Sequence, residues 1–319
     1  MSRLFWQNVN FVGLRRTIPQ ICKEIWAIVA GQRSLTTRRL DSLVPIAVGG
    51  LRRILFSLVA GLMVLGWSAG AIAGPLAERL AQFPNWEARP PVQAAAGDLY
   101  YPDWFRGTWD VTTALVDLAA PLAPTVTTPG FEQNRRFLHQ PIPFQARFIP
   151  VDRPLLPRGF GVLGQLPTAS PVVADRAFNG LNLARAYLDE SADVETSRVV
   201  DVRVDPTNPN RQLTVLQGDR RLISTISARA TETPTSDEFV TSEIFQQEFR
   251  RSNQLYLNQV ETTTRYTHHD STQANEPSIT AEQVTAIYLA PQDPEFEQAG
   301  DRPVALYRYS LDFFPATSS

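Results

Sequence analysis

The chain has 319 residues, a formal net charge of −2, three histidines and one cysteine. Its length suits one large domain or two ordinary domains. The part after residue 73 holds 21 basic and 30 acidic residues and contains no cysteine, methionine or lysine. This composition excludes disulfides, thiol catalysis and cysteine-ligated metals in that part, and it makes nucleic acid and anionic membrane surfaces poor partners.

The first 50 residues show no sustained pattern of a folded core. Two interpretations are open. Residues 1–50 are either a disordered leader that reflects a start codon assigned too far upstream, or a genuine cytoplasmic extension. We favour the leader with a mis-assigned start, because nothing in this segment alternates for long.

Residues 51–73 combine the three parts of a secretory signal. Two arginines precede an uncharged apolar stretch, 54–77, and alanines occupy positions −3 and −1 of a predicted cleavage site between Ala73 and Gly74. The alternative is an uncleaved membrane anchor, because the stretch approaches the ~20 apolar residues that span a bilayer. Both interpretations place the rest of the chain outside the cytoplasm.

A β-domain is predicted for residues 102–316, after an Ala- and Pro-rich spacer, 74–101, that includes a short helix. Gly107 opens its first strand. Alternation places Trp109 on one face of this strand together with Val111, Thr113 and Leu115. Trp109 is predicted to close the floor of a barrel, with its indole N–H bonded to a partner.

The middle of the chain predicts one strand, 144–149, and one helix, 174–188. Residues 159–164 match G-x-G-x-x-G, but prolines flank them where a dinucleotide site needs a strand and a helix, so no cofactor is predicted. The helix has an apolar face, and its charged side chains, Arg176 among them, are predicted to point to water. We expect this helix to cap or flank the barrel.

Seven further strands follow, at 197–205, 211–217, 221–230, 238–250, 255–267, 280–289 and 304–314. Turn residues such as Gly218-Asp219 connect the earlier ones. Short sequential strands of this kind favour an antiparallel meander over a parallel sheet. The predicted fold class is therefore mainly β: an antiparallel lipocalin-like β-barrel of about nine strands with one flanking helix.

The strand 255–267 has no purely apolar face. Glu261 and Arg265 share one face with Gln259 and Thr263, and the other face alternates Tyr, Asn, Val and Thr. Such a strand lines a wet cavity, docks another surface, or carries a ladder of Thr and charged side chains in solvent. The last interpretation is the simplest.

The sequence predicts no catalytic residues and no metal site. His268, His269 and Asp270 are neighbours whose side chains alternate faces on a strand, and a hairpin turn explains them equally well. There is no G-x-S-x-G motif, and acidic pairs such as Glu243 and Glu248 are interpreted as solvated surface. Whether the chain is an enzyme stays open, with the balance against it.

Arginine and tyrosine supply the remaining candidates. Arg308 lies on the last strand, which in a closed meander adjoins the first, and it is predicted to stack on Trp109 and lock the ends of the sheet together. The ligand or closure candidates are Trp109, Arg308, Tyr307, Tyr309, Glu261 and Arg265.

Four blocks carry a family resemblance: PDWFRGTWDVT, ADRAFNGLNLARAYL, VETTTRYT and AEQVTAIYLAPQDPEFEQAGDRPVALYRYSLDF. They resemble an uncharacterised family of exported proteins of cyanobacteria and chloroplasts. The resemblance implies a thylakoid-lumen or periplasmic location and carries no established activity. A looser similarity to the lipocalin or calycin group comes from Gly107, Trp109 and Arg308, although lipocalins place their helix after the barrel.

These observations lead to two functional hypotheses that involve a ligand or partner, and to a third in which the protein is a structural accessory of the export pathway without a ligand. The first is an exported β-barrel that binds a partner protein or a hydrophobic small molecule, such as a pigment or lipid, in support of photosynthetic membranes. The second is a lipocalin-like enzyme acting on a lipid or isoprenoid. Neither involves nucleic acid, and contact with the membrane is expected only through residues 54–77 if they are not cleaved.

Overall fold

The structure is a computed structural model that describes residues 74–127, 131–151, 170–188, 199–252, 254–270, 273 and 275–317. The leader, the signal or anchor segment and the G-x-G-x-x-G stretch at 159–164 lie outside the described residues. No helix in the described part combines the length and the apolar character that crossing a membrane requires.

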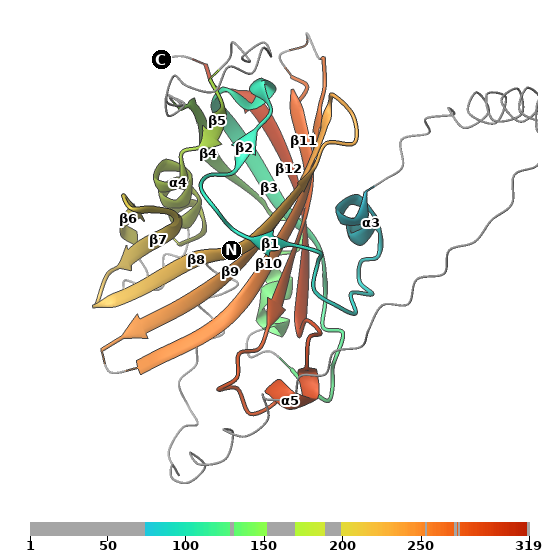
Figure 1. Ribbon diagram of the computed structural model, residues 1–319, viewed down its shortest axis with the longest axis vertical. Coiled ribbons are helices and arrows are strands. Elements are labelled where there is room, and N and C mark those ends of the chain that lie inside the picture. Colours follow the sequence, from blue (N-terminus) through green and yellow to red (C-terminus); the bar gives the residue numbers. More distant parts are fainter. Residues whose placement is uncertain are drawn as a thin grey trace, which may run out of the picture. The chain divides into compact units, whose positions relative to one another are not determined.

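An antiparallel sheet dominates the described part of the chain (Figure 1). Its order is β2-β5-β4-β3-β12-β11-β10-β9-β8-β7-β6, and β1 pairs with β8 beside this path. The strands are β1 (Gln93–Ala94), β2 (Tyr100–Tyr101), β3 (Gly107–Ala119), β4 (Pro141–Pro150), β5 (Val172–Ala174), β6 (Val199–Asp205), β7 (Asn208–Leu216), β8 (Arg220–Glu232), β9 (Glu238–Arg251), β10 (Gln254–His268), β11 (Ile279–Tyr288) and β12 (Ala305–Pro315).

The sequence located all of the long strands. Each of the predicted strands corresponds to one of β3, β4 and β6 to β12, and the short strands β1, β2 and β5 were not predicted. Helical elements are few and short: α3 (Pro75–Ala81), η1 (Asp103–Phe105), η2 (Glu132–Phe137), α4 (Arg176–Leu188) and α5 (Phe296–Ala299).

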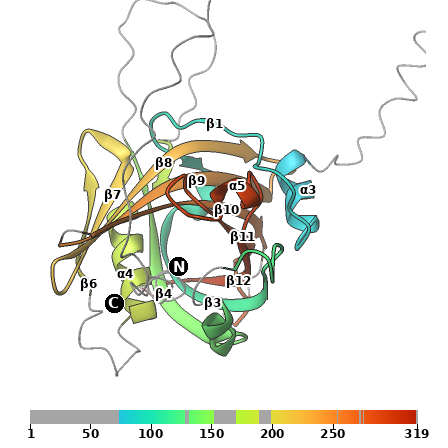
Figure 2. The ribbon, with the colours of Figure 1, turned by 90° about the horizontal axis from the view of Figure 1, so that it is seen from below.

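The prediction of a closed nine-stranded barrel was wrong. The sheet is strongly curled but open, a half-barrel (Figure 2). The strands β2 and β6 stand at the two ends of its strand order. β12 does pair with β3, as expected for the last and first long strands. That pairing lies in the interior of the sheet, however, because the sheet continues beyond β3 through β4, β5 and β2.

Helix α4 occupies the open side of the curl, where it contacts β4 on one flank and β6 and β7 on the other (Figure 2). The side-chain amide of Asn179 bonds to the backbone of Arg147 as a neighbouring strand would, accepting from its N–H at 2.6 Å and donating to its C=O at 3.1 Å. On the other flank, a Cβ at Gly180 would lie 2.8 Å from the Gln212 side chain and 3.1 Å from Val202. A glycine at this position therefore permits the close approach of helix and sheet.

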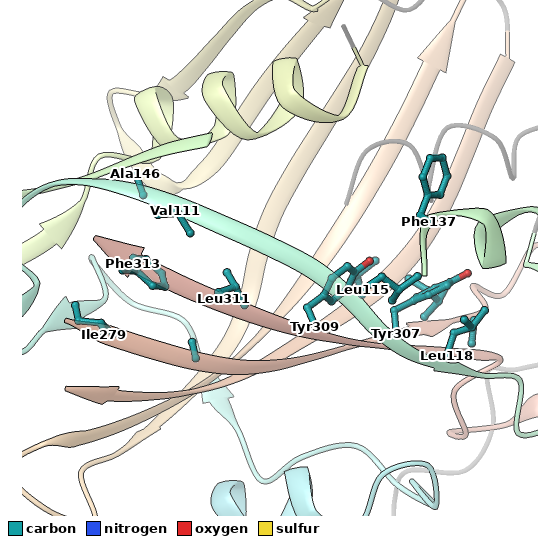
Figure 3. Packing of buried hydrophobic residues seen from close by; sticks show 14 of the residues in the cluster. Val111, Leu115, Leu118, Phe137, Ala146, Ile279, Tyr307, Tyr309, Leu311 and Phe313 are labelled. Carbon is teal, nitrogen blue, oxygen red and sulfur yellow. The ribbon is translucent and has the colours of Figure 1, made fainter. Parts of the chain in front are cut away.

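The concave face of the sheet carries the main core (Figure 3). Trp109 belongs to it, is 6% exposed and donates its indole N–H to the carbonyl of Phe105 at 2.7 Å. The expected partner for the indole is thus present. Val111 and Leu115 of β3 lie beside the odd-numbered residues of β12, which are Tyr307, Tyr309, Leu311 and Phe313.

The convex face carries a second core, which α3 covers. Leu76 and Leu80 of the helix pack with Val240, Val284 and other buried residues of β9, β11 and β12. The backbone N–H groups of Leu76 and Ala77 donate to the carboxylate of Glu232 in β8. The interpretation of residues 74–101 as a spacer therefore understated their part in the fold.

Candidate functional site

A pocket of about 270 Å³ lies between α4 and the concave face of the sheet. Helix α4 forms one wall, and strands β2 to β5, β7 and β10 to β12 form the others. Aromatic and aliphatic side chains dominate the lining, with a few polar groups among them. The lining residues are Tyr101, Thr113, Phe144, Ala146, Phe148, Ala174, Arg176, Asn179, Gly180, Leu183, Tyr187, Gln212, Tyr266, Gln283, Tyr309, Leu311 and Phe313.

The aromatic side chains at one end of the pocket form a packed cluster. Tyr101 makes edge contacts with the rings of Phe105, Phe148 and Phe239 at centroid distances of 4.9, 4.9 and 5.6 Å. Tyr266 adjoins the same cluster through Phe105, at 5.0 Å. Because these rings hold one another in place, this end of the pocket is a preformed apolar surface.

A charged cluster of Arg176, Arg229 and Glu243 lies at the same side of the interior. Arg176, the first residue of α4, donates through Nη2 to Glu243 Oε1 at 3.0 Å. Arg229 Nε lies 3.3 Å from the same oxygen without the alignment of a hydrogen bond. The side chains of Arg229 and Glu243 are each 11% exposed, and that of Arg176 is 17% exposed.

Two guanidinium groups share one carboxylate in this cluster, and their pKa values shift in opposite directions. Burial lowers the pKa of Arg229, and the like charge of Arg176 adds to this while Glu243 opposes it. Burial also tends to lower the pKa of Arg176, but the interactions with Glu243 and Tyr101 are larger in sum, and the pKa of Arg176 is raised. Burial raises the pKa of Tyr101 well above its ordinary value, with smaller contributions from Tyr266 and Glu243, so its hydroxyl stays protonated.

The interior also holds polar atoms that no described protein group satisfies. Gln247 Oε1, Asn258 Oδ1 and Thr262 Oγ1 are buried and lack a hydrogen-bond partner among the described residues. Gln247 and Asn258 are paired directly across β9 and β10, so their amides share one site on the concave face. Unsatisfied groups of this kind are typical of an interior that water or a ligand enters.

Comparison with known proteins adds one finding. Residues 93–317 match a family described as a domain of unknown function (DUF6816). The chain belongs to this family. No curated protein and no solved structure matches the chain. In this chain the DUF6816 domain covers all strands of the curled sheet and α4, while α3 precedes it.

Three of the predicted site residues lie on the concave face of the DUF6816 domain. Tyr309 lines the pocket, and Trp109 and Tyr307 lie in the core around it. Asn134 donates to the Tyr307 hydroxyl at 3.0 Å, which fixes that ring in the core.

The other three predicted residues lie on the convex face and do not reach the pocket. Glu261 is 0% exposed and accepts two hydrogen bonds from Arg79 of α3, at 2.7 and 2.8 Å, and one from Tyr288 at 2.6 Å. Arg265 donates to the carbonyl of Ala77 at 2.8 Å. The β10 face that carries Glu261 therefore docks α3, and the simpler interpretation of a ladder in solvent was wrong.

The predicted stacking of Arg308 on Trp109 was also wrong. In β12 the residue paired with Trp109 is Pro315, whereas Arg308 is paired with Asp117 and points to the convex face. There it forms an ion pair with Glu282 at 2.5 Å and lies over the ring of Phe83. The β-bulge beside Arg308 does not change this, because even and odd residues of β12 stay on opposite faces.

Histidine geometry offers no metal site among the described residues, where no group of three potential ligands occurs. His268 stacks on Trp104 at a centroid distance of 5.2 Å, and His269 bonds to Thr280 at 2.8 Å. Both belong to the hairpin between β10 and β11.

Sequence reasoning missed the charged cluster of the pocket. Arg176 was predicted to point to water and Glu243 to lie on a solvated surface, but both are largely buried. The signal that could have found Glu243 is its place in β9, where Phe239, Phe245 and Phe249 share its face. A carboxylate between apolar residues on a core face needs a buried cationic partner.

Proposed function

We propose that this protein binds a compact, mainly apolar small molecule in the pocket beneath α4. The observation that carries the proposal is the pocket itself: a partly open hollow lined largely by aromatic side chains, bounded on one side by a single helix and supplied with a few polar groups. Its volume of about 270 Å³ is close to the lower end of the ~300–1,000 Å³ typical of ligand sites. This size favours a compact ligand over an extended pigment or lipid.

We also propose that the protein acts outside the cytoplasm, in the thylakoid lumen or the periplasm. The signal-like residues 51–73 and the lack of cysteine after them support this. Helix α3 begins at Pro75, so cleavage after Ala73 would leave it intact. N-terminal sequencing of the protein purified from its host is expected to start at Gly74; a start upstream of the apolar stretch would contradict cleavage.

The binding proposal is tested with prodan, a neutral naphthalene dye whose emission shifts to the blue in apolar surroundings. Protein obtained by expressing the full chain should bind the dye with a saturable blue shift. Leu183→Trp places an indole in the pocket from α4, so binding should weaken at least about tenfold through steric exclusion. Ala174→Phe fills the pocket from β5 and provides a second test if the first variant is unstable.

The matched control is Val200→Trp, which introduces the same residue at a position of β6 that is 59% exposed and lies outside the pocket. It should bind prodan as the unsubstituted protein does, with all variants compared by thermal unfolding. Equal loss of binding in the control, or unchanged binding in both pocket variants, would refute the pocket as the site.

A further inference from the structure

The guanidinium group of Arg176 lies on the pocket wall with most of its donors free. Within the described part of the chain its one hydrogen bond is the 3.0 Å contact from Nη2 to Glu243. A guanidinium carries five N–H donors in a planar fork. Arg176 also lines the pocket, so the remaining donors are available to a group placed there.

Charge balance in the cluster leaves this guanidinium incompletely neutralised. Glu243 Oε1 serves both Arg176 and Arg229, at 3.0 and 3.3 Å. Arg229 uses its other nitrogens on the carbonyl of Gly97 and on the amide oxygen of Asn210. Asp98 has a weaker electrostatic interaction with both arginines but forms no ion pair with either in the described part. One carboxylate in contact with two buried guanidinium groups favours a second anion beside them.

We propose that Arg176 is the specificity-determining residue of the pocket and holds the carboxylate, or another oxyanion, of an amphipathic ligand. The inference rests on the proposed binding function and names the ligand class. The apolar body of the ligand would lie against the aromatic lining, with Phe144 and Tyr309 among its walls, while its anion pairs with the guanidinium fork. The site thus selects for small aryl or alkyl acids over neutral molecules of equal size.

The test compares 2-naphthoate with 2-naphthamide, which differ in charge but scarcely in size. Isothermal titration calorimetry at neutral pH should show naphthoate binding on the order of tenfold or more tighter than the amide, because the carboxylate forms an ion pair with the guanidinium where the amide offers only a neutral acceptor. Arg176→Gln should remove this preference and leave amide binding within about threefold. Arg203→Gln, which removes an exposed arginine of β6 outside the pocket, should keep the preference in full.

Arg176→Lys, which retains the positive charge, shows whether a loss of binding in Arg176→Gln comes from misfolding. Arg176→Gln leaves Glu243 with Arg229 alone, so its unfolding temperature must be compared with that of Arg176→Lys, which should keep part of the preference for naphthoate. Equal affinity of the native protein for acid and amide would overturn the anion site while leaving the pocket proposal standing. Failure of both naphthalenes and of prodan to bind would overturn the pocket itself and this inference with it.

Discussion

Glu261 shows how a charged residue can serve the fold instead of a ligand. Its carboxylate is fully buried and accepts hydrogen bonds from Arg79, Tyr288 and Thr263. Arg79 in turn stacks on the ring of Trp86 at 4.0 Å. The carboxylate of Glu261 is thus fully hydrogen-bonded. Removing either Arg79 or Glu261 would leave the other charge buried without its partner.

Arg79→Ala is therefore expected to destabilise the protein by about 3–5 kcal/mol, since it leaves the Glu261 charge buried without its partner. Urea denaturation followed by circular dichroism measures this. The control is Arg135→Ala, which removes an exposed pair with Glu132 of the same 2.7 Å separation and should leave the stability almost unchanged. Similar losses in the two variants would contradict the structural role of the buried pair.

Arg308 and Trp109 should behave differently from each other, because they lie on opposite faces of the sheet. Arg308→Ala breaks a partly exposed ion pair with Glu282 and should cost about 0–1 kcal/mol. Trp109→Phe removes the hydrogen bond to Phe105 and leaves a space in the core, at about 1–3 kcal/mol. Thermal unfolding distinguishes the two; equal shifts would revive a shared role in closing the sheet.

At the scale of elements, alternation located the strands because the long strands of the domain keep a period of two. The sequence placed Trp109, Val111 and Leu115 on one face of β3, and all are buried there. In β10, alternation did not distinguish a buried face from a solvent face. The reason is that α3 covers Glu261 on the convex side. A short helix was predicted within the Ala- and Pro-rich segment 74–101, but its contact with the sheet was not, and so the reason for a charged residue in the strand was missed.

The position of α4 could not be inferred from its own residues. Its apolar face predicted packing against the sheet, but only the open curl shows that it bridges β4 to β6 and β7. What was missing was the knowledge that strands far apart in the sequence leave the sheet open. A closed barrel would have left no place for a helix against the concave face. For the same reason the sequence could not reveal that Arg176 faces a pocket.

Asn179 is predicted to fasten α4 to the sheet. Asn179→Ala removes both hydrogen bonds to the backbone of Arg147 and should cost about 1–3 kcal/mol, since that N–H loses a partner in a partly buried position. Hydrogen exchange at the Arg147 amide should accelerate more than exchange in the β9–β10 pair. Uniform acceleration across the sheet would indicate that the helix is not a separately attached element.

At the scale of the whole domain, buried tyrosines predict loss of stability in alkali. Burial raises the pKa of Tyr187 and of Tyr266 to about 12 and shifts the pKa of Tyr101, Tyr256, Tyr288 and Tyr309 upward as well. A raised pKa in the folded state means that the protonated form is favoured by folding. The resulting contribution to the free energy of unfolding is fully present below about pH 10, the ordinary tyrosine pKa. It is lost as the pH rises toward the pKa values of the folded state.

Absorbance titration at 295 nm combined with circular dichroism tests this behaviour. These six tyrosines should ionise together with unfolding, between about pH 10 and 12, and not before it. Stepwise ionisation of all of them near pH 10 with an intact fold would show that the interior is open to solvent.

The most direct test of the account is to identify what the pocket holds in the cell. The protein and its Leu183→Trp variant are purified from the native host, denatured, and the released small molecules are compared by mass spectrometry. The account predicts a compact amphipathic acid released in amounts comparable to the protein from the unsubstituted chain and strongly depleted from the variant. Release of the same compounds in equal amounts from both proteins, or of none from the unsubstituted chain, would contradict it.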